Sequence, residues 1–496
     1  MMMVRKLSIQ ERKTGRTLIK ELDLTINKGD KLAIIGEEGN GKSTLLQVVR
    51  GTEFVPEYVE VSGEVSSQAS VIGYLEQQVN EEDSVRIMDL FQEVDWNETL
   101  LKTMKEFGID NLYSEQLFKS LSGGEKVRYQ LLAMLAVEPD LILLDEPTND
   151  IDIEAIEWLE RFVKEITIPV VYVSHDEVFI QKTATIILHI ELAGRKDIPL
   201  HTIDKEGYES YRKRRQERIE KEEHQIKSQT RDMAEREAAL RQVWQKAEHQ
   251  HQNVNRADPR LQKKVANLKN QRTRLEKEKS NIKGFTAYEK ESYFSFDYAA
   301  YVLTGKKLAT IDVPVLQNEG KMLAKEIVLP IETGQKIVIT GNNGCGKSTL
   351  LKEIYNQIPK SKVGYMPQNY QEVLPMNQSA VEYLVQTGEA EEKTAIYTML
   401  GNINFTHEEM LVPMSELSGG QQAKVLLLSM IHSEAEVLVL DEPTRNLSPI
   451  TNPQLYQELS QFKGTVISVS HDRKYIESLG GICYLLTEKG LEIKEQ

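Results

Sequence analysis

Long apolar runs are missing from this sequence of 496 residues. No uninterrupted stretch approaches the roughly 18–20 apolar residues that a membrane-spanning helix needs. This absence argues against a transporter that carries its own membrane domain. The first residues, MMMVRKLSIQERK, have no apolar core of the kind that a signal peptide has, so we expect a cytoplasmic protein with no membrane contact.

Cysteine is scarce as well, because only Cys345 and Cys483 occur. Two cysteines are too few for a disulfide framework, for an iron–sulfur cluster or for a structural zinc site. What remains is the composition of an ordinary globular protein, with 40% apolar and 28% charged residues. The length suits two or three domains, each large enough for a core of its own.

Charge is distributed unevenly along the chain. The net formal charge is −15, which by itself argues against a nucleic-acid partner. Between Tyr208 and Lys283, however, there are 21 Lys and Arg residues but only 12 Asp and Glu residues. A basic segment on an acidic body predicts an anionic partner for that segment alone, although a solvated helix rich in Lys and Arg would have the same composition.

One set of short motifs occurs twice in the chain. Corresponding positions of the paired motifs are always 296 residues apart. A repeat this regular indicates two copies of one domain. The pairs are LSGGE at Leu121–Glu125 and LSGGQ at Leu417–Gln421, LLDEPT ending at Thr148 and VLDEPT ending at Thr444, and SHD at Ser174–Asp176 and Ser470–Asp472.

Each copy alternates short apolar runs with stretches that suit helices. In the first copy these runs are KLAIIG at Lys31–Gly36, DLILLDE and IPVVYVSHD, and the second copy repeats the order with KIVITG, VLVLDE and GTVISVSHD. Such runs are typical of interior strands in a parallel sheet. We therefore predict an α/β fold with two related domains, at residues 1–200 and 302–496, joined by a linker at residues 201–301.

The linker has the periodicity of a helical hairpin. Apolar residues recur at every seventh position in two series, which are Ile219, Ile226, Met233 and Leu240, and then Leu261, Leu268, Leu275 and Ile282. A single apolar column with charged flanks predicts two helices paired as an antiparallel coiled coil. Asp258 and Pro259 suit a helix start, so the tip falls at about residues 249–258. A first helix of roughly 40 residues would be about 60 Å long.

Two Gly-rich turns match the P-loop pattern G-x-x-x-x-G-K-[ST]. In this pattern backbone N–H groups point at the phosphates of ATP, the Lys contacts the β- and γ-phosphates, and the Ser ligates Mg²⁺. A Gly-rich turn without a ligand is the alternative, but a strand precedes and a helix follows both turns. The predicted nucleotide-binding residues are Gly36, Gly39, Asn40, Gly41, Lys42, Ser43 and Thr44 in the first turn and Gly341, Gly344, Cys345, Gly346, Lys347, Ser348 and Thr349 in the second.

Polar residues after the apolar strands complete an ATP-hydrolysing site in each copy. An Asp would hold Mg²⁺, the Glu after it would polarise the attacking water, a His would contact the γ-phosphate, and a Gln would sense metal and water. A lone His at a strand end is usually structural, but both recur here within complete sets. The predicted catalytic residues are Gln77, Glu146 and His175, and Gln368, Glu442 and His471. The predicted metal ligands are Ser43, Gln77, Asp145, Ser348, Gln368 and Asp441.

The motif LSGG-[EQ], found here beside two P-loops, resembles the signature of the ATP-binding cassette (ABC) ATPases, over about 400 of the 496 residues. In that family, the signature Ser and Gly amides bind the γ-phosphate that the opposite domain holds. The resemblance implies that site one adds Ser418, Gly419 and Gly420, and that site two adds Ser122, Gly123 and Gly124. ATP would then join the two domains of a monomer, and hydrolysis would release them.

Two departures set this chain apart from the family pattern. ABC proteins usually stack adenine on an aromatic side chain upstream of the P-loop, but residues 1–53 and 302–341 contain no Phe, Tyr or Trp. Arg12 and Arg16 are the candidates to stack instead. After the metal-binding Asp, the first copy reads EPTNDID and the second EPTRNLSP, so Ser448 stands where Asp152 stands. We therefore expect asymmetric communication between the two sites.

Fused cassettes that are joined by a basic helical hairpin resemble the ABC-F family. Chromosome-maintenance ATPases insert their coiled coil between P-loop and signature, whereas here it follows the His motif. The resemblance implies the 70S ribosome as partner, with the protein at the E site. The hairpin would point at the P-site tRNA and at large-subunit rRNA near the peptidyl-transferase centre.

The EPTRN-x-SP form of the second copy resembles the antibiotic-resistance branch of ABC-F proteins. That resemblance implies protection of the ribosome from drugs of the peptidyl-transferase centre, with lincosamides, streptogramin A compounds and pleuromutilins ahead of phenicols and oxazolidinones. A housekeeping ABC-F translation factor is one alternative, although such factors generally show EPTNHLD twice. An ATPase subunit of a separate permease is the other.

Overall fold

The computed structural model describes residues 2–67, 69–76, 85–91, 98–112, 114–149, 151–196, 198–252, 263, 266–275, 294–296, 305–318, 320–360 and 362–494. The chain divides into two compact units. One unit holds both predicted ATPase domains and comprises Met1–Glu191, Pro199–Tyr208 and Glu291–Gln496. The other comprises Leu192–Ile198 and Glu209–Lys290 and contains the predicted hairpin.

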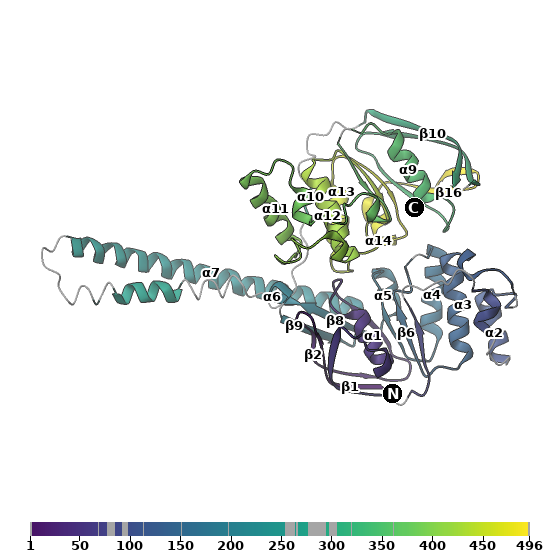
Figure 1. The fold of residues 1–496 in the computed structure, drawn as a ribbon, viewed down its shortest axis with the longest axis horizontal. Helices are drawn as coiled ribbons and strands as arrows, with labels where there is room; N and C mark the ends of the chain where they lie inside the picture. The colour runs from purple at the N-terminus through teal and green to yellow at the C-terminus, as the bar shows by residue number, and fades with distance from the viewer. Residues whose placement is uncertain are drawn as a thin grey trace. The chain divides into compact units, whose positions relative to one another are not determined.

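The first ATPase domain contains two sheets, drawn in purple and blue in Figure 1. A six-stranded sheet has the order β5-β6-β7-β3-β8-β9, and a three-stranded antiparallel sheet has the order β2-β1-β4. The strands are β1 (Met2–Glu11), β2 (Thr17–Ile26), β3 (Lys31–Ile35), β4 (Val59–Ser67), β5 (Ile72–Leu75), β6 (Leu141–Asp145), β7 (Val170–Val173), β8 (Ile186–Leu192) and β9 (Ile198–Asp204). The helices are α1 (Lys42–Arg50), α2 (Glu98–Phe107), α3 (Gly123–Ala136), α4 (Ile153–Glu165), α5 (Glu177–Thr183) and α6 (Ala193–Lys196).

The second ATPase domain repeats this plan, drawn in green and yellow in Figure 1. Its six-stranded sheet has the order β13-β14-β15-β12-β16-β17, and β10 and β11 form an antiparallel pair. The strands are β10 (Lys307–Asn318), β11 (Lys321–Glu332), β12 (Lys336–Thr340), β13 (Val363–Met366), β14 (Val437–Asp441), β15 (Thr465–Val469), β16 (Ile482–Thr487) and β17 (Gly490–Ile493). The helices are α9 (Lys347–Gln357), α10 (Ala380–Leu384), α11 (Ala390–Asn402), α12 (Gly419–His432), α13 (Asn452–Gln461) and α14 (Arg473–Leu479).

The central strands of the second domain are buried on both faces, which explains their continuous apolar sequence. Ile337 and Ile339 of β12 pack in a cluster with α9, β10 and β11. Val338, which points to the opposite face, packs with α12, α13 and α14. The strands of the core are parallel, so the predicted α/β fold is confirmed for both copies. Parallel pairing also brings the carboxyl ends of β6 and β7, and of β14 and β15, to one edge.

The core of the second domain begins earlier in the chain than residue 302. Phe294 and Phe296 are 1% and 3% exposed and belong to the cluster that includes Phe462. The backbone N–H of Phe296 donates to Glu458 at 3.2 Å. These two aromatic residues, which the predicted boundaries place in the linker, therefore pack as part of the ATPase core. The boundaries 1–200, 201–301 and 302–496 otherwise stay predictions.

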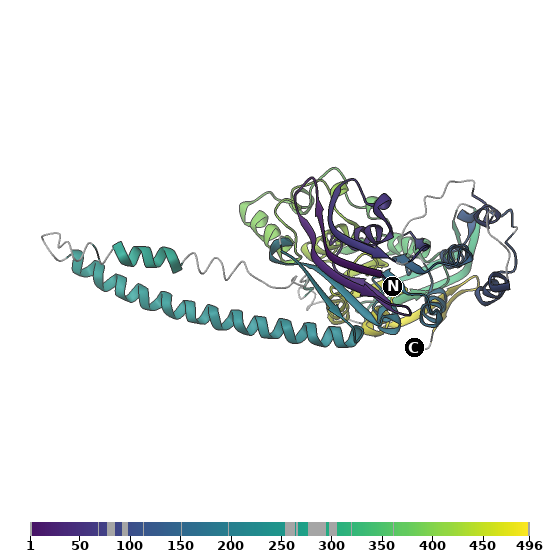
Figure 2. The ribbon, with the colours of Figure 1, turned by 90° about the horizontal axis from the view of Figure 1, so that it is seen from below.

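The first helix of the predicted hairpin is α7 (Tyr208–Gln252), a continuous helix of 45 residues. Residues 266–275 form a second helical stretch, which lies alongside α7 in both views (Figures 1 and 2). Met233 and Leu268, one from each seven-residue series, are 9% and 7% exposed. The predicted tip from residue 253 onward, Leu261 and Ile282 lie outside the described residues, so pairing along the full length stays a prediction. Among the described helices, none is both long and apolar enough to cross a membrane.

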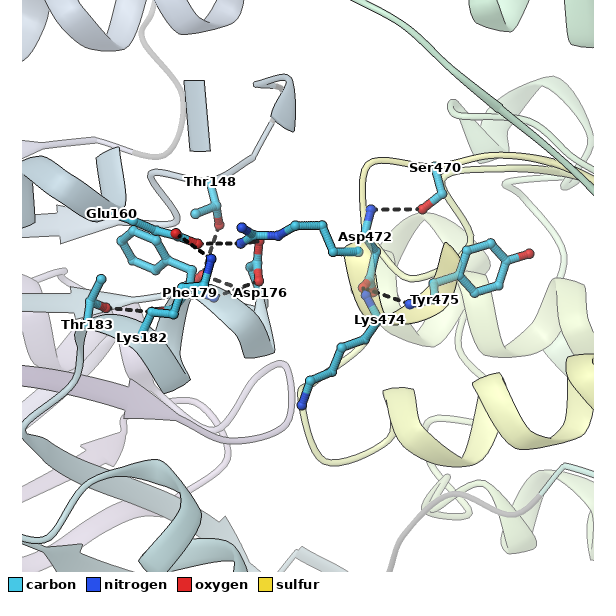
Figure 3. Close-up of polar contacts among 12 residues, drawn as sticks. Thr148, Glu160, Asp176, Phe179, Lys182, Thr183, Ser470, Asp472, Lys474 and Tyr475 are labelled. Carbon is cyan, nitrogen blue, oxygen red and sulfur yellow. Dashed lines mark hydrogen bonds and ion pairs between the residues drawn. The ribbon is translucent and has the colours of Figure 1, made fainter. Parts of the chain in front are cut away.

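A network of buried charges links the two ATPase domains through α4 and α5 on one side and α14 on the other (Figure 3). The guanidinium of Arg473 donates to Glu160 and lies 3.5 Å from Asp176, and Lys474 Nζ lies 2.7 Å from a Glu177 carboxylate oxygen. The Glu160 and Glu177 side chains are 6% and 2% exposed. After the repeated SHD motif, the first copy continues with acid and the second with two bases, so the signs are complementary.

We predict that Arg473→Ala lowers the free energy of unfolding by about 3 kcal/mol, because Asp176 would lose its cation and Glu160 would keep only the half-exposed Lys182. The matched control is Lys182→Ala, which removes another cation from Glu160. Lys182 is 43% exposed at 2.9 Å from that carboxylate, so its loss should cost about 1 kcal/mol or less. Urea unfolding followed by circular dichroism measures both, and equal losses would contradict the assignment.

The loss in free energy of unfolding caused by Arg473→Ala should also become smaller as the pH falls. Burial raises the pKa of Asp176, and the charge of Arg473 opposes that rise. Without Arg473, the pKa of Asp176 in the folded state would move further above its unfolded value. A group of this kind contributes stability that is present at low pH and lost as the pH rises through its folded pKa. The same unfolding measurement on wild type and variant at pH 5 and pH 8 checks the sign.

Candidate functional site

Both P-loops have the same backbone geometry. The glycine before each P-loop helix has a left-handed backbone, with φ of 86° at Gly41 and 100° at Gly346, which glycine adopts at least cost. Lys42 Nζ donates to the carbonyls of Gly36 at 2.9 Å and of the next residue at 3.0 Å. Lys347 makes both contacts in its own loop at the same distances. Each loop thus holds an ammonium group beside the N-terminus of a helix, where phosphate binds.

Carboxylates at the ends of β6 and β14 fit a magnesium ion. Ser43 donates to Asp145 at 3.0 Å, and Ser348 hydrogen-bonds to Asp441, so the two members of each predicted ligand pair lie side by side, while metal binding stays a prediction. Asp441 Oδ1 is buried and has no hydrogen-bond partner among the described residues. Burial, and then the neighbouring Glu146, raise the pKa of Asp145 to about 6. A divalent cation would relieve this crowding of carboxylates, and oxygen donors are the ligands that Mg²⁺ prefers.

No group of three or more His, Cys, Asp or Glu side chains within the described part of the chain forms a metal site on its own. Mg²⁺ sites of the nucleotide-binding kind use one or two protein carboxylates together with phosphate and water, and Asp145 and Asp441 would hold the ion in that way.

The predicted catalytic glutamates have a strained backbone in both copies. Glu146 and Glu442 have φ of 50° and 47°, which is uncommon for residues other than glycine. Each N–H donates to the end of the neighbouring strand, to Val173 at 3.0 Å and to Val469 at 2.9 Å. Strain that is kept in place by such bonds occurs at functional sites, but Glu138 and Glu434, which lie outside the predicted site, share a φ of 49°, so the catalytic role of Glu146 and Glu442 stays a prediction.

Each glutamate faces the histidine of its own copy. In the first copy His175 Nε2 lies 2.9 Å from Glu146, and in the second copy His471 Nε2 lies 3.7 Å from Glu442. Burial, and then the charge of Lys347, lower the pKa of His471 to about 4, so this imidazole is neutral at pH 7. Burial, and then the charge of Asp441, raise the pKa of Glu442 to about 8. The two sites therefore differ in geometry as well as in sequence.

The two signature motifs are helix N-termini closed by capping boxes. Ser122 and Ser418 are the N-caps of α3 and α12, and each hydroxyl accepts the N–H three residues later. The fifth motif residue, Glu125 or Gln421, accepts the N–H of the Ser in return. This S-x-x-[EQ] pattern leaves the N–H groups of the motif glycines at the helix start, where an anion binds. The capping role was visible in the sequence but was not recognised.

Residues predicted for site two from both domains line one cavity, and their roles stay predictions. A cavity of about 1010 Å³ is lined by P-loop and catalytic residues of the second copy and by signature residues of the first. His175 and Glu146 of the first copy also line it. The predicted residues on its wall are Gly344, Gly346, Lys347, Ser348, Thr349, Gln368, Asp441, Glu442 and His471, with Ser122 and Gly123. Gly124, Gly341 and Cys345 are not among its lining residues.

Site one joins the first P-loop to the second signature motif through two acidic side chains. Glu38 accepts a hydrogen bond from the N–H of Gly420, and Glu37 lies 2.9 Å from Lys424 Nζ. Ser418 is the N-cap of α12, and Gly419 is the first residue of that helix, directly before Gly420. The prediction placed this motif opposite Lys42 and Ser43, but it did not foresee that P-loop side chains would occupy the contact. The only signal was the mismatch between GEEGNGKST and GNNGCGKST.

The remaining predicted residues have mixed outcomes. Asn40 is 1% exposed, and its Nδ2 donates to Ile190 at 3.1 Å, which ties the loop to β8, so this side chain has a structural role. Thr44 lies at the start of α1, Gly36 and Gly39 lie in the loop before it, and the roles of all these residues stay predictions. Gln77 lies outside the described residues.

The aromatic residue Tyr58 lies near the first P-loop, but it comes after that loop in the sequence, whereas the family pattern places an aromatic residue before it. The hydroxyl of Tyr58 lies 3.2 Å from Thr44 Oγ1, and the Tyr58 residue is 56% exposed. Arg12, one of the two residues predicted to stack on adenine, instead donates from Nε to the carbonyl of Val59 at 2.8 Å. Arg16 Nε is buried without a hydrogen-bond partner among the described residues.

Comparisons with known proteins identify the family of this chain. The family model for the ABC transporter matches residues 19–149 and 324–445, just over half of the chain. ABC transporter F family member 2 of Arabidopsis thaliana is 28% identical over 96% of this chain and 75% of its own length. The Ribosome protection protein VmlR of Bacillus subtilis is 27% identical over 96% of this chain and 85% of its own length.

Among solved structures, the archaeal ribosome recycling factor aABCE1, in complex with the stalk protein aP1, has a similar fold. It is 17% identical, with a TM-score of 0.59 over 98% of this chain and 89% of that chain. At this identity the likeness concerns the fold alone. The chain therefore belongs to the ABC family, as the matched family model shows, and with its duplicated sites and its F-family relatives it is an ATP-hydrolysing ABC-F ATPase with two ATPase domains.

Proposed function

We propose that this ABC-F ATPase binds the 70S ribosome and protects it from antibiotics that act at the peptidyl-transferase centre. The observation that carries the proposal is the basic helical segment between two ATP-binding domains. Lys263, Lys269 and Arg272 are all exposed, and the last two lie on the helical stretch 266–275. A face of this kind binds phosphate backbones without reading sequence, as contact with rRNA and tRNA requires. The protein would work in the cytoplasm, as a monomer.

The ATP sites would act as a clamp. Lys42 and Lys347 would hold the β- and γ-phosphates, and the signature amides of the opposite domain would complete each site. Mg²⁺, when bound, would neutralise charge on the phosphates beside Asp145 and Asp441. Glu146 and Glu442 would orient the attacking water, so closure and release of the domains would follow the state of the γ-phosphate. Ribosome binding would then depend on ATP, and release would depend on hydrolysis.

The resistance branch is supported by the second copy's EPTRNLSP and by the relative from Bacillus subtilis whose name describes ribosome protection. The first copy's EPTNDID, which is close to the form of translation factors, favours a housekeeping ABC-F role as the second candidate. An ATPase subunit of a separate permease is the third, and would be recognised by its co-purification with membranes.

A hydrolysis-deficient variant tests the ribosomal part. Glu146→Gln with Glu442→Gln should lower phosphate release by about 10²–10⁴-fold, because both water-orienting carboxylates are removed while ATP binding remains. This variant should co-sediment with 70S ribosomes in the presence of ATP. The matched control, Lys42→Ala with Lys347→Ala, should not, because it loses phosphate contacts. If the glutamine variant sediments no better with ribosomes than the control does, the ribosomal proposal is wrong.

Inhibitory drug concentrations separate the resistance role from the housekeeping role. Expression in a sensitive bacterial host should raise the inhibitory concentrations of lincosamides, streptogramin A compounds or pleuromutilins. Phenicols and oxazolidinones form the second group in the panel. The Glu146→Gln/Glu442→Gln chain should give no protection, because it is not released. Unchanged concentrations for every class, with ribosome binding intact, would favour the translation-factor role.

The basic face of the hairpin provides an independent prediction. Replacing Lys263, Lys269 and Arg272 with Ala should weaken ribosome binding and flatten its salt dependence, by up to about 2 units in the slope of log K against log salt. The control replaces the exposed Lys13, Lys20 and Lys28 of the first ATPase domain, which changes net charge equally. Equal effects of the two triple variants on binding would mean that only overall charge matters.

A further inference from the structure

The first P-loop carries two acidic side chains that reach into the second ATPase domain. The Glu37 carboxylate accepts hydrogen bonds from Ser448 and, at 2.7 Å, from Thr451, while Lys424 Nζ lies 2.9 Å away. The Glu37 side chain is 12% exposed and that of Lys424 is 8% exposed. Glu37 is therefore a buried carboxylate whose partners all come from the opposite domain.

Glu37 stays ionised in this environment. Burial would raise its pKa, but the ammonium of Lys424 and the hydrogen bonds from Ser448 and Thr451 hold the pKa well below its usual value. A charged group that is largely buried and held by three donors keeps a fixed position. Glu37 thus anchors the outer part of the P-loop to the helix α12 and to the segment after β14.

The neighbouring Glu38 lies against the signature motif itself. Its carboxylate accepts the N–H of Gly420. A Cβ at Gly420 would clash with that carboxylate, and one at Gly419 would lie 3.7 Å from its other oxygen. The carboxylate therefore takes up the amide of Gly420 and lies beside Gly419, and the ABC resemblance assigns the amides of both glycines to the γ-phosphate. An anion from the protein occupies the place where site one would bind an anion from ATP.

The second copy has the opposite arrangement of charge. Its P-loop carries Asn342 and Asn343 at the corresponding positions, and Asp152 stands where Ser448 stands. Asn343 Oδ1 lies 3.5 Å from Lys347 within its own loop. The acid thus belongs to the P-loop in site one and to the facing segment in site two. Ser448 is compatible with Glu37 because an Asp in its place would bring two carboxylates together.

We propose that Glu38 makes site one selective against ATP relative to ADP, and that Glu37 is the positioning residue that keeps Glu38 in place. The γ-phosphate of ATP must displace Glu38 from the N–H of Gly420, whereas ADP carries no γ-phosphate and leaves that contact intact. Site two, with Asn343, has no such competition. This inference rests on the assignment of the signature amides to the γ-phosphate and is independent of any ribosomal role.

Nucleotide titrations of the full-length chain test the proposal. Lys347→Ala removes the phosphate-binding ammonium of site two, and the fluorescent forms of ADP and of the non-hydrolysable analogue AMP-PNP then report on site one. Glu38→Asn should increase the affinity for AMP-PNP by roughly tenfold, which is the order expected for one charge-assisted hydrogen bond. The affinity for ADP should change by less than about twofold, because ADP does not reach the contact.

The mirror variant is the matched control. In a Lys42→Ala chain, Asn343→Glu should lower the affinity of site two for AMP-PNP and leave its affinity for ADP unchanged. Glu37→Gln in the site-one background should release Glu38 and so shift the AMP-PNP to ADP ratio in the same direction as Glu38→Asn, but less. Glu38→Gln, which keeps the length of the side chain, separates charge from size and should resemble Glu38→Asn.

The ratio of the two affinities decides the outcome. If Glu38→Asn changes both affinities by the same factor, Glu38 has only a structural role and the proposal is wrong. A lower affinity for AMP-PNP would also overturn it, because Glu38 would then support ATP binding. If Lys347→Ala prevents folding, steady-state hydrolysis by the chain with Lys347 intact replaces the titration: Glu38→Asn should lower the ratio of KM for ATP to the inhibition constant for ADP.

Discussion

The structure depends on one electrostatic constraint, which is that buried backbone N–H groups and ammonium groups need anions. Both ATP sites place a P-loop lysine and a helix N-terminus on one domain and a capped signature helix on the other. Neither domain alone surrounds a triphosphate. In the proposed clamp, ATP bound by one domain would draw the other domain toward it, and the nucleotide would control that approach.

Charge complementarity between the domains follows from the same constraint. Arg473 and Lys474 of the second copy meet buried acids of the first, and Glu37 of the first meets Lys424 of the second. Buried charges of this kind stabilise only when each is paired, so they favour the pairing of unlike copies over like ones. A duplicated domain has here diverged into two complementary halves. The same divergence makes the two ATP sites unequal.

The differences between the two sites explain in physical terms why the second copy reads EPTRNLSP where the first reads EPTNDID. Ser448 replaces an Asp, and it donates to the Glu37 carboxylate across the interface. The distance between Glu and His also differs, at 2.9 Å in the first copy and 3.7 Å in the second. An ATPase with one site that carries its own anion and one that does not can respond to ATP and ADP in steps. Stepwise closure would suit a protein that must bind its target and later leave it.

Much of the site could be read from the sequence because its chemistry is local. A P-loop, a Walker-type Asp–Glu pair after an apolar strand and an S-x-x-[EQ] cap each lie within a few consecutive residues, and their backbone geometry follows from glycines and caps. The repeat distance then predicted two domains, and the structure confirmed the α/β fold of both. The helix α7 followed from its seven-residue periodicity in the same way.

The sequence alone could not predict contacts between residues that are far apart in the chain. Nothing in GEEGNGKST says that Glu37 would meet Thr451 or that Glu38 would meet Gly420, because those partners lie about 400 positions away and are brought close only by the pairing of the domains. Phe294 and Phe296 likewise joined a core that the composition of the linker did not indicate. The sequence by itself determined the chemistry of each half-site, since that chemistry is encoded in short segments. Only the tertiary structure decided which side chains complete each site, because burial and charge pairing across an interface depend on every element that positions it.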